Sequence, residues 1–367
     1  MQKREIMATI VRKSLRLNMN PLFEKEDCKL HLDQSHLLGN PFIGIEDKNL
    51  LFDIYKKSSF KKFSEQTGIQ FSNGDTEKTY GEILEGHHES KYNPSMGVKH
   101  NNYLLDESFE IFLKPKMSFS YFRKKAEPIA FSCSHEDFSQ KNEANEYLVE
   151  YFVHKYASSY FDTRNKLHGE HYSTGFSKYL NLGQLHPFEI VKAVSQYEKK
   201  WGSNKSTYWI KVELLWREYF YWLYTENGTD FFRSEGLEGG SLVLDKINLT
   251  DYLNKTNINP LIKAMNNELM NEGTLSNRSR QIYASFVVNC TDLDWRHGAW
   301  FFQLFLIDYD LYSNWGNWLY LSGWGTDSRG PRFFNIVKQM KNYDPELSYL
   351  NKYNPGVINP WEAIKND

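Results

Sequence analysis

The sequence predicts a mainly helical fold in which a long helical part follows a smaller α/β unit. From Asn142 onward, apolar residues recur at the spacing of helices that bury one face. Before that point, short strand-like and helix-like segments alternate, which is typical of an α/β unit. A chain of 367 residues can bury a substantial core, and its aromatic share of 16% supplies many rings for that core and for functional roles.

Three short segments are the candidate elements of the α/β unit. Residues 29–35 (KLHLDQS) predict a strand, residues 50–68 predict a helix that ends at Gly68, and residues 69–75 (IQFSNGD) predict a second strand with a turn. Residues 85–102 are polar and lack an apolar period, so they predict an exposed connection.

Six segments of the second part have the helical period. Nothing repeats at a period of twenty to fifty residues, which argues against a solenoid. The predicted helices span residues 143–161, 188–202, 207–224, 260–273, 278–289 and 298–311.

Charge and cysteine content narrow the classes of function. The net charge is −2, so any contact with nucleic acid must come from a local basic patch. Cys28, Cys133 and Cys290 are far apart and lack the spacing of metal ligands, which indicates a reducing compartment. No long apolar run is present, so we expect a cytoplasmic protein without a signal peptide or membrane anchor.

A carboxylate, a guanidinium and aromatic rings share one surface of the predicted helix 207–224. The helical period places Glu213 and Arg217 beside Trp209, Trp216 and Phe220. Such a surface could form part of a binding site. An ion pair between Glu213 and Arg217 beside core aromatics is the simpler interpretation.

The sequence YSTGFSKYL places hydroxyls and a glycine directly before an apolar helical segment. Ser173, Thr174, Gly175 and Ser177 could bind an anion such as a phosphate, because their donors and the helix dipole both favour negative charge. The simpler alternative is an ordinary helix cap.

Two further groups of polar residues lie near predicted helix ends. Asn277, Arg278 and Arg280 lie between two predicted helices, where an arginine could bind a phosphate or a carboxylate, or could form a solvated cap. Asp308 and Asp310 lie near the end of a predicted helix, where the dipole disfavours carboxylates. That cost suggests a partner such as a ribose hydroxyl, a metal or an arginine.

Histidine spacing does not predict a metal site. His87, His88, His168 and His171 lie in polar surroundings without a third ligand at suitable spacing, so they are interpreted as surface residues. The common nucleotide and hydrolase motifs are also absent from the sequence.

Taken together, the segments resemble the flavin-binding half of the photolyase/cryptochrome family, and most closely the DASH cryptochromes. The resemblance covers residues 142–348 almost continuously. It is carried by residues 160–165 (YFDTRN), 172–187 (YSTGFSKYLNLGQLHP), 206–220 (STYWIKVELLWREYF), 275–286 (LSNRSRQIYASF), 293–318 (LDWRHGAWFFQLFLIDYDLYSNWGNW) and 334–345 (FNIVKQMKNYDP).

The front of the chain has a thinner resemblance. Residues 11–23 are similar to the opening strand of the family's α/β domain, and residues 117–129 to the segment that leads out of that domain. The resemblance implies a shortened, Rossmann-like α/β domain with a linker over residues 1–130 and a helical FAD-binding domain over residues 131–367. The shortening argues against an antenna chromophore site.

For the cofactor, the resemblance implies FAD. Asn314 matches the residue that faces the reactive nitrogen of the isoalloxazine, where an amide can tune protonation without adding charge. The implied FAD-binding residues are Tyr160, Ser173, Thr174, Gly175, Phe176, Ser177, Glu213, Arg280, Asp308, Asp310 and Asn314.

Trp318 and Trp295 match the first two members of the family's chain of tryptophans that photoreduces the flavin. No tryptophan lies between Trp222 and Trp295, where the outer member would be expected. Tyr252 or another nearby tyrosine could substitute, or the chain could end early.

For the substrate, the resemblance implies a pyrimidine dimer in DNA. The residues at the family's lesion-binding positions are Arg164, Glu213, Trp216, Arg217, Asn277, Arg278, Gln281 and Tyr320. A carboxylate and amides can hydrogen-bond the pyrimidine edges while aromatic rings stack on a flipped dimer. Gln281 and Tyr320 follow the DASH pattern, which is associated with single-stranded DNA, and the absence of a histidine at this edge argues against (6-4) repair.

The leading hypothesis is therefore a monomeric, FAD-dependent deoxyribodipyrimidine photolyase of DASH type, a carbon–carbon lyase that repairs cyclobutane pyrimidine dimers in single-stranded DNA under blue light. Its implied catalytic residues are Glu213, Asn314, Trp318 and Trp295. The main alternative is a blue-light receptor that signals to a protein partner through flavin photoreduction. A third is a flavin scaffold with a light-independent or structural role.

Overall fold

The computed structural model describes most of the chain after residue 142 and short parts before it. The predicted elements at residues 11–23, 29–35, 50–68, 69–75 and 85–102 lie outside the described residues, so the α/β unit stays a prediction. The described residues are 41–43, 104–105, 107–114, 116–132, 143–181, 183–358 and 360–363.

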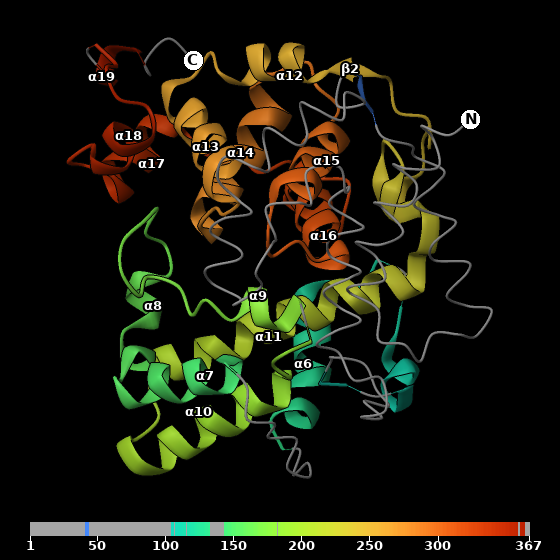
Figure 1. Ribbon diagram of the computed structural model, residues 1–367. Coiled ribbons are helices and arrows are strands. Elements are labelled where there is room, and N and C mark those ends of the chain that lie inside the picture. The colour runs from blue at the N-terminus through green and yellow to red at the C-terminus, as the bar shows by residue number, and fades with distance from the viewer. Residues whose placement is uncertain are drawn as a thin grey trace, which may run out of the picture.

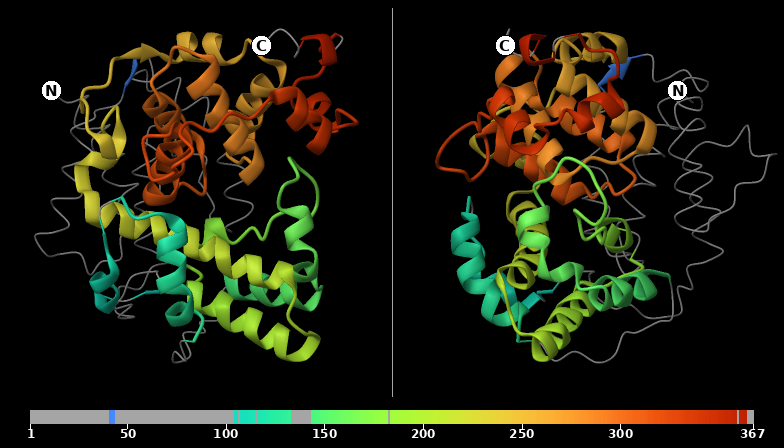
Figure 2. Two further views of the ribbon diagram at one scale, coloured as in Figure 1. Left: turned by 180° about the vertical axis from the view of Figure 1, so that it is seen from behind. Right: turned by 90° about the vertical axis from the view of Figure 1, so that its left-hand side faces the viewer.

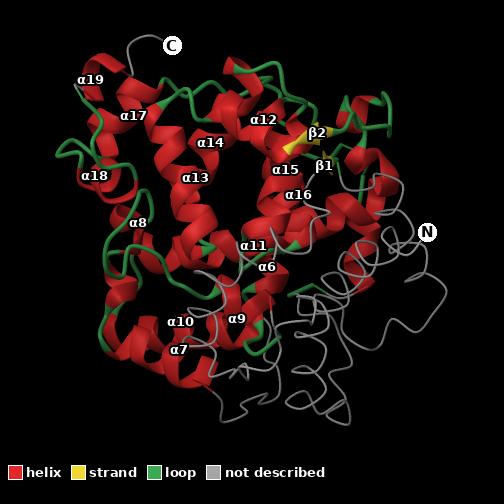
Figure 3. Cartoon of the chain, turned by 45° about the horizontal axis from the view of Figure 1, so that its top comes forward, coloured by secondary structure: helices red, strands yellow, loops and turns green. Residues whose placement is uncertain are grey.

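Helices dominate the described part of the chain, as predicted (Figure 3). In Figure 1 the helices form a lower group, α6 to α10, and an upper group, α12 to α18. The helices of the lower group are α6 (Phe119–Ala130), α7 (Glu143–Val153), α8 (Tyr160–Thr163), α9 (Ser177–Asn181) and α10 (Pro187–Trp201). Those of the upper group are α12 (Leu249–Thr256), α13 (Pro260–Glu272), α14 (Asn277–Cys290), α15 (Trp295–Phe305), α16 (Leu311–Ser322), α17 (Ile336–Tyr343) and α18 (Ser348–Tyr353), with α19 (Pro360–Ala363) at the end.

The long helix α11 (Lys205–Asn227) joins the two groups. It packs against α6, α8 and α10 of the lower group and against α16 of the upper group, and two further views show the same arrangement (Figure 2). Short 3-10 helices lie between the larger elements. They are η3 (Glu107–Phe112), η4 (Tyr156–Ser158), η5 (Gly228–Phe232) and η6 (Gly236–Glu238).

Capping residues mark the starts of the long helices, close to the predicted positions. Asn204 caps α11 by accepting from the backbone N–H groups of Ser206 and Thr207. Before α10, His186 and Glu189 form a capping box, and a proline occupies the first helical position. The predictions for residues 188–202, 207–224, 260–273 and 278–289 are confirmed.

Two of the predicted helices are wrong in part, and the part of the chain after residue 142 also contains a short strand. The segment 143–161 breaks after Val153, where Lys155 adopts a left-handed conformation with φ of 61°. The segment 298–311 ends at Phe305, and a new helix begins at Leu311. In addition, β2 (Ile247–Asn248) pairs in parallel with β1 (Phe42–Ile43).

Close packing of α15, α16 and α11 forms the centre of the core. A Cβ atom at Gly298 would lie 2.1 Å from Cη2 of Trp318, so glycine is required where α16 approaches α15. A Cβ at Gly316 would likewise lie 2.3 Å from Cδ1 of Phe220 on α11. Among the described helices, none is both long and apolar enough to cross a bilayer.

Candidate functional site

A cavity of about 710 Å³ lies where the two helix groups meet. Its walls come from α8, α9 and α11 on one side and from α14, α16 and the segments that flank α16 on the other. Fifteen of the residues that the resemblance implies for the site line this cavity, although they are far apart in the chain. They are Tyr160, Arg164, Thr174, Phe176, Ser177, Glu213, Trp216, Arg217, Asn277, Arg278, Arg280, Gln281, Asp308, Asp310 and Tyr320.

Glu213 on α11 is the carboxylate of the first wall. Its Oε1 accepts hydrogen bonds from Nε1 of Trp209, at 2.9 Å, and from Nη1 of Arg164. The Arg164 guanidinium lies 4.6 Å from the centroid of the Trp209 ring. In place of the expected pairing with Arg217, the carboxylate is thus held by a residue 49 positions away, at the C-terminal end of α8, and by an indole one turn earlier.

Burial and charge act in opposite directions on Glu213. Desolvation raises the pKa of its carboxyl group, whereas Arg164 and the Trp209 hydrogen bond act to lower it, and the net shift is upward. The carboxylate is therefore close to an anion-stabilising guanidinium and half-buried in the cavity wall.

Aromatic rings continue this wall toward α16. Trp216 stacks on Phe119 of α6 with ring centroids 3.5 Å apart. The ring of Tyr320 stands edge-on to Trp216 at 5.4 Å, and both side chains line the cavity. One face of the indole is thus covered from α6, a helix that the predicted domain division assigns to the first domain.

Arg280 and Asp308 form an ion pair across the cavity from this wall. Nη2 of Arg280 lies 2.9 Å from both carboxylate oxygens of Asp308, and its Nε donates to the carbonyl oxygen of Leu275. Asp308 therefore has an arginine partner, one of the partners that the sequence suggested.

The expectation that the dipole at a helix end disfavours both aspartates is wrong for Asp310. Its Oδ1 accepts from the backbone N–H of Ser313 at 2.8 Å, which makes Asp310 the N-cap of α16. The dipole at a helix start favours a carboxylate, so the expected cost is absent. The error came from extending the preceding helix through residues 306–311.

The segment 173–177 leads into α9 beside the cavity. Thr174, Phe176 and Ser177 line it, whereas Ser173 and Gly175 are not among the lining residues. Gly175 has a φ of 67°, and a Cβ there would lie 2.6 Å from the Tyr147 hydroxyl, which donates to the carbonyl oxygen of Thr174. Glycine therefore sets the path of the chain at this point.

Asn314, Trp318 and Trp295 are buried in the core and are not among the residues that line the cavity. Nδ2 of Asn314 donates to the carbonyl oxygen of Ala299 at 2.9 Å, while Ser313 and Asn317 of the same helix line the cavity. The roles implied for these three residues stay predictions.

Trp318 and Trp295 contact different aromatic rings. The ring of Trp318 lies 5.2 Å from that of Phe302 and 6.3 Å from that of Tyr283. Trp295 lies 5.8 Å from Trp315.

Tyr252, the suggested substitute for an outer tryptophan, lies on the Trp318 side. Its hydroxyl is 3.0 Å from that of Tyr283, and the hydroxyl of Tyr283 donates to Oδ1 of Asn266. The Tyr252 ring packs 4.8 Å from Phe301. Tyr252 is thus connected to Trp318 through Tyr283.

Sequence reasoning missed a charged loop at the cavity rim. Asp327 accepts hydrogen bonds from the backbone N–H, Nε and Nη2 of Arg329 and from Nη1 of Arg332. Burial acts to raise the pKa of Asp327, but these hydrogen bonds lower it to about 2. Nη2 of Arg329 also donates to the hydroxyl of Tyr320 at 3.0 Å.

Both arginines of this loop line the cavity. The signal in the sequence was an aspartate followed by arginines two and five positions later in TDSRGPR. In a glycine-rich stretch that pattern also describes an ordinary solvated turn, so it did not stand out.

Three buried polar atoms of the cavity wall lack a hydrogen-bond partner among the described residues. They are Nε of Arg164, Nε of Arg278 and Oδ1 of Asn181, and all three residues line the cavity. Buried polar groups in proteins are nearly always paired. Their arrangement fits a ligand that carries both hydrogen-bond acceptors and donors.

The described histidines do not form a metal site. His168 Nε2 lies 2.9 Å from the Ser348 hydroxyl, and the His171 ring stacks on Tyr156. Within the described part of the chain, no three His, Cys, Asp or Glu side chains cluster as metal ligands do. His87 and His88 lie outside it.

Comparisons with known proteins find relatives of this chain. The family model for the FAD binding domain of DNA photolyase matches residues 209–363. A cryptochrome DASH from Vibrio parahaemolyticus is 44% identical over 205 residues, which cover 55% of this chain and 46% of that protein. One from Idiomarina loihiensis is 37% identical over 287 residues, which cover 69% of this chain and 64% of that protein.

A crystal structure of a cryptochrome from Synechocystis sp. is similar as well. It has a TM-score of 0.62 and 32% identity, and the match covers 72% of this chain and 63% of that chain. The chain thus spans less than two thirds of the length of these relatives. The chain belongs to the photolyase/cryptochrome family, and its helical part contains that family's FAD-binding domain.

Proposed function

We propose that this protein repairs cyclobutane pyrimidine dimers in single-stranded DNA by light-driven electron donation from reduced FAD. The observation that supports this most strongly is Glu213, a half-buried carboxylate held by Arg164 and Trp209 in the wall of the cavity. The cavity is also lined by Trp216 and Tyr320, which are the kind of rings that stack on an extruded base.

FAD fits the polar side of the cavity. Arg280, Asp308 and Asp310 with the segment 173–177 would hold the cofactor, and Tyr160 would border it. The unpartnered Nε atoms of Arg164 and Arg278 suit the oxygens of a phosphate or of the DNA backbone. When bound and reduced, FAD would supply on excitation the electron that breaks the two carbon–carbon bonds of the cyclobutane ring, and that electron would return to the flavin, so that the reaction is redox-neutral.

The residues of this chain would bind and orient the dimer. Ionised Glu213 would accept a hydrogen bond from the imide N–H of a pyrimidine, and Arg164 would keep the carboxylate ionised and in place. Trp216 and Tyr320 would stack on the dimer, while Asn277 and Gln281 offer amide groups to its edges. Arg217 and Arg278 would contact phosphates.

Three core residues complete the proposal. Asn314 would tune the protonation of the flavin, and Trp318 and Trp295 would carry electrons toward it. Electrons would reach the flavin by hops between neighbouring rings, starting from rings nearer the protein surface. The contact between Trp295 and Trp315 makes Trp315 a further candidate for this route.

A repair assay tests the proposal. The purified protein, with its flavin verified by absorption and then chemically reduced, is exposed to blue light with an oligonucleotide that contains a thymine dimer. We expect dimers to be lost from single strands in the light and to persist in the dark. A flavin that is photoreduced without any loss of dimers would contradict repair and would favour the receptor alternative.

A further inference from the structure

Cations lie over aromatic rings along one side of the molecule, from the end of α10 to the wall of the cavity. We call this set the cation–ring row. It consists of Trp201 with Lys155 and Lys200, Phe161 with Lys205, and Trp209 with Arg164.

The inner end of the row is continuous with the cavity. Trp209 and Arg164 line it, and the ring of Phe161 stands edge-on to Trp209 with centroids 5.3 Å apart. The backbone N–H of Phe161 donates to the hydroxyl of Ser206 at 3.0 Å, which ties α8 to the first turn of α11. The Nζ of Lys205 lies 3.7 Å from the centroid of the Phe161 ring.

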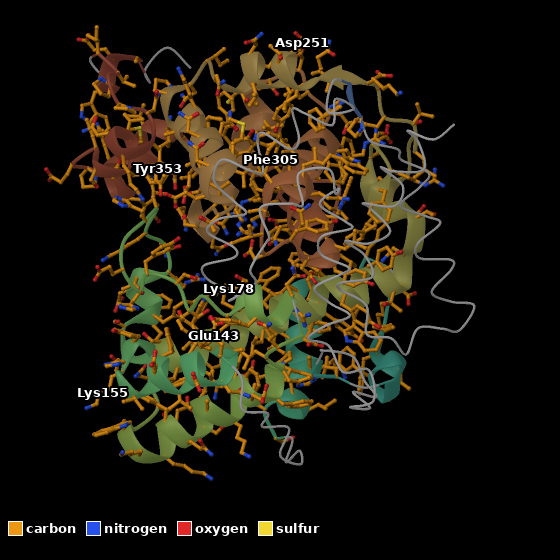
Figure 4. All side chains as sticks on the ribbon, viewed as in Figure 1. Glu143, Lys155, Lys178, Asp251, Phe305 and Tyr353 are labelled. Atoms are coloured by element: carbon orange, nitrogen blue, oxygen red, sulfur yellow. The ribbon has the colours of Figure 1, made fainter. Side chains whose placement is uncertain are left out.

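The outer end of the row faces solvent. The Trp201 side chain is 51% exposed, and the Nζ of Lys155 lies 3.7 Å from its ring centroid. The Nζ of Lys200 lies 5.0 Å from the same centroid. In Figure 4, Lys155 points outward at the edge of the lower helix group.

Charge on this side is mainly positive. Lys155, Lys200 and Lys205 are exposed, whereas Glu198 is bonded inward to Thr207 and Lys211. Asp162 on α8 is an exposed residue of opposite sign. A single cation over a ring is common on protein surfaces, but a series of such pairs that leads into a cavity combines a stacking platform with charges for a phosphate backbone.

We infer that the cation–ring row binds the single strand that flanks the nucleotides in the cavity. Bases would stack on Phe161 and then on Trp201, and the lysines would move from the rings to the adjacent phosphates. A single strand is the fitting partner, because in a duplex the base faces are already stacked on each other. This inference rests on the proposed function, since it extends the same DNA beyond the cavity.

The experiment measures dark binding of undamaged oligothymidylate to the flavin-containing protein by fluorescence anisotropy. Two strand lengths are used, about 6 and about 20 nucleotides, because the longer strand can pass both rings. The variants are Phe161→Leu, Lys205→Gln and Trp201→Leu. Lys114→Gln is the matched control, because Lys114 is also exposed and lies over a ring, at 4.7 Å from Tyr121.

We expect Phe161→Leu to weaken binding of both strands about fivefold or more, and Trp201→Leu to weaken binding of the longer strand alone. Lys205→Gln should lower the slope of log affinity against log salt by about 0.7. Lys114→Gln should bind as the parent does. Unchanged flavin absorption and thermal unfolding would show that each variant is folded.

Parent-like affinity in the three variants would overturn the inference. Equal losses for single strands and for a duplex of the same length would also overturn it, because the row would then bind any phosphate backbone. The readout uses undamaged DNA in the dark, so it does not depend on repair. A protein that binds through the row and repairs no dimers would contradict the proposed function while leaving the row as a binding surface.

Discussion

Two carboxylate–arginine groups on opposite sides of the cavity differ in the direction of their pKa shifts. On α11, desolvation raises the pKa of Glu213 despite its bonds to Arg164 and Trp209. In the loop after α16, hydrogen bonds from Arg329 and Arg332 lower the pKa of Asp327 to about 2 even though its side chain is only 3% exposed. Burial acts to raise the pKa in both groups, so the opposing hydrogen bonds and charges matter for the direction of each shift.

The number of donors to each carboxylate differs between the two groups. Asp327 receives four hydrogen bonds on its two oxygens, whereas the bonds of Glu213 all reach Oε1. A fully bonded carboxylate stays ionised and holds its arginines in place. A partly bonded one keeps an oxygen for a ligand, so we propose that Glu213 contacts the substrate and that Asp327 positions the rim arginines.

The largest expected effect is that of Glu213→Gln on repair. The amide keeps the size of the side chain and removes its charge, so repair at saturating DNA should fall about 100-fold. In the parent, the ionised form is lost as the pH falls through the raised pKa, so repair should decline on an acid limb above pH 4.5, the ordinary pKa of the group. Single-turnover repair over a pH series measures both effects, and an acid limb that persists in the variant would assign it to another group.

A smaller effect is expected for Asp327→Asn, and on binding instead of repair. Arg329 and Arg332 would lose their anionic partner, so the affinity for single-stranded DNA should fall about tenfold while the rate at saturating DNA stays the same. Asp292→Asn is the control, because Asp292 is an exposed partner of Lys255. A reduced rate with unchanged affinity would contradict this and would assign Asp327 to the reaction instead of to DNA binding.

Asp327 also makes the stability of the fold depend on pH in the acid range. Because its pKa in the folded protein lies below the ordinary 3.8, its ionised form stabilises the protein above that value. This contribution to stability is lost as the pH falls toward 2. The stability of Asp327→Asn should therefore fall less than that of the parent over this pH range.

The smallest effect on function, and a clear one on stability, is expected for Glu218→Gln. Glu218 is buried on α11, its Oε1 accepts from the backbone N–H of Leu104, and its Oε2 has no partner among the described residues. Burial raises its pKa to about 8. Between pH 4.5 and 8 the unfolded chain releases this proton and the folded protein keeps it, so stability falls as the pH rises.

Urea unfolding at the two ends of that range measures this effect. Glu218→Gln should reduce the fall in the free energy of unfolding by an amount on the order of 1–3 kcal/mol. Part of the fall should remain, because the pKa of Glu268 is also raised to about 8. An unchanged pH dependence in the variant would show that Glu218 is ionised in the folded protein.

The sequence predicted the helices whose ends carry local signals, such as α10 with its capping box and α11 with Asn204. It also placed the residues of the cavity wall correctly on α11 and α14. It could not predict the end of α15 at Phe305, because apolar residues continue through residue 307 and only the tertiary packing ends the helix there. That error carried over to Asp310.

Long-range partners were beyond the reach of spacing alone. The bond between Glu213 and Arg164 joins residues 49 positions apart, and helical periodicity could suggest only Arg217 as a partner. The resemblance to the family named both residues, but not their contact. The Asp327 group was missed because nothing in a polar turn shows which of its side chains will be buried.

The most direct test of this account is single-turnover, light-driven repair of a dimer-containing single strand at saturating concentration, with the parent, Glu213→Gln and Asp327→Asn in one series. The account predicts that the parent and Asp327→Asn repair at the same rate and that Glu213→Gln is about 100-fold slower. Equal rates for the parent and Glu213→Gln, or no repair by the parent, would contradict it.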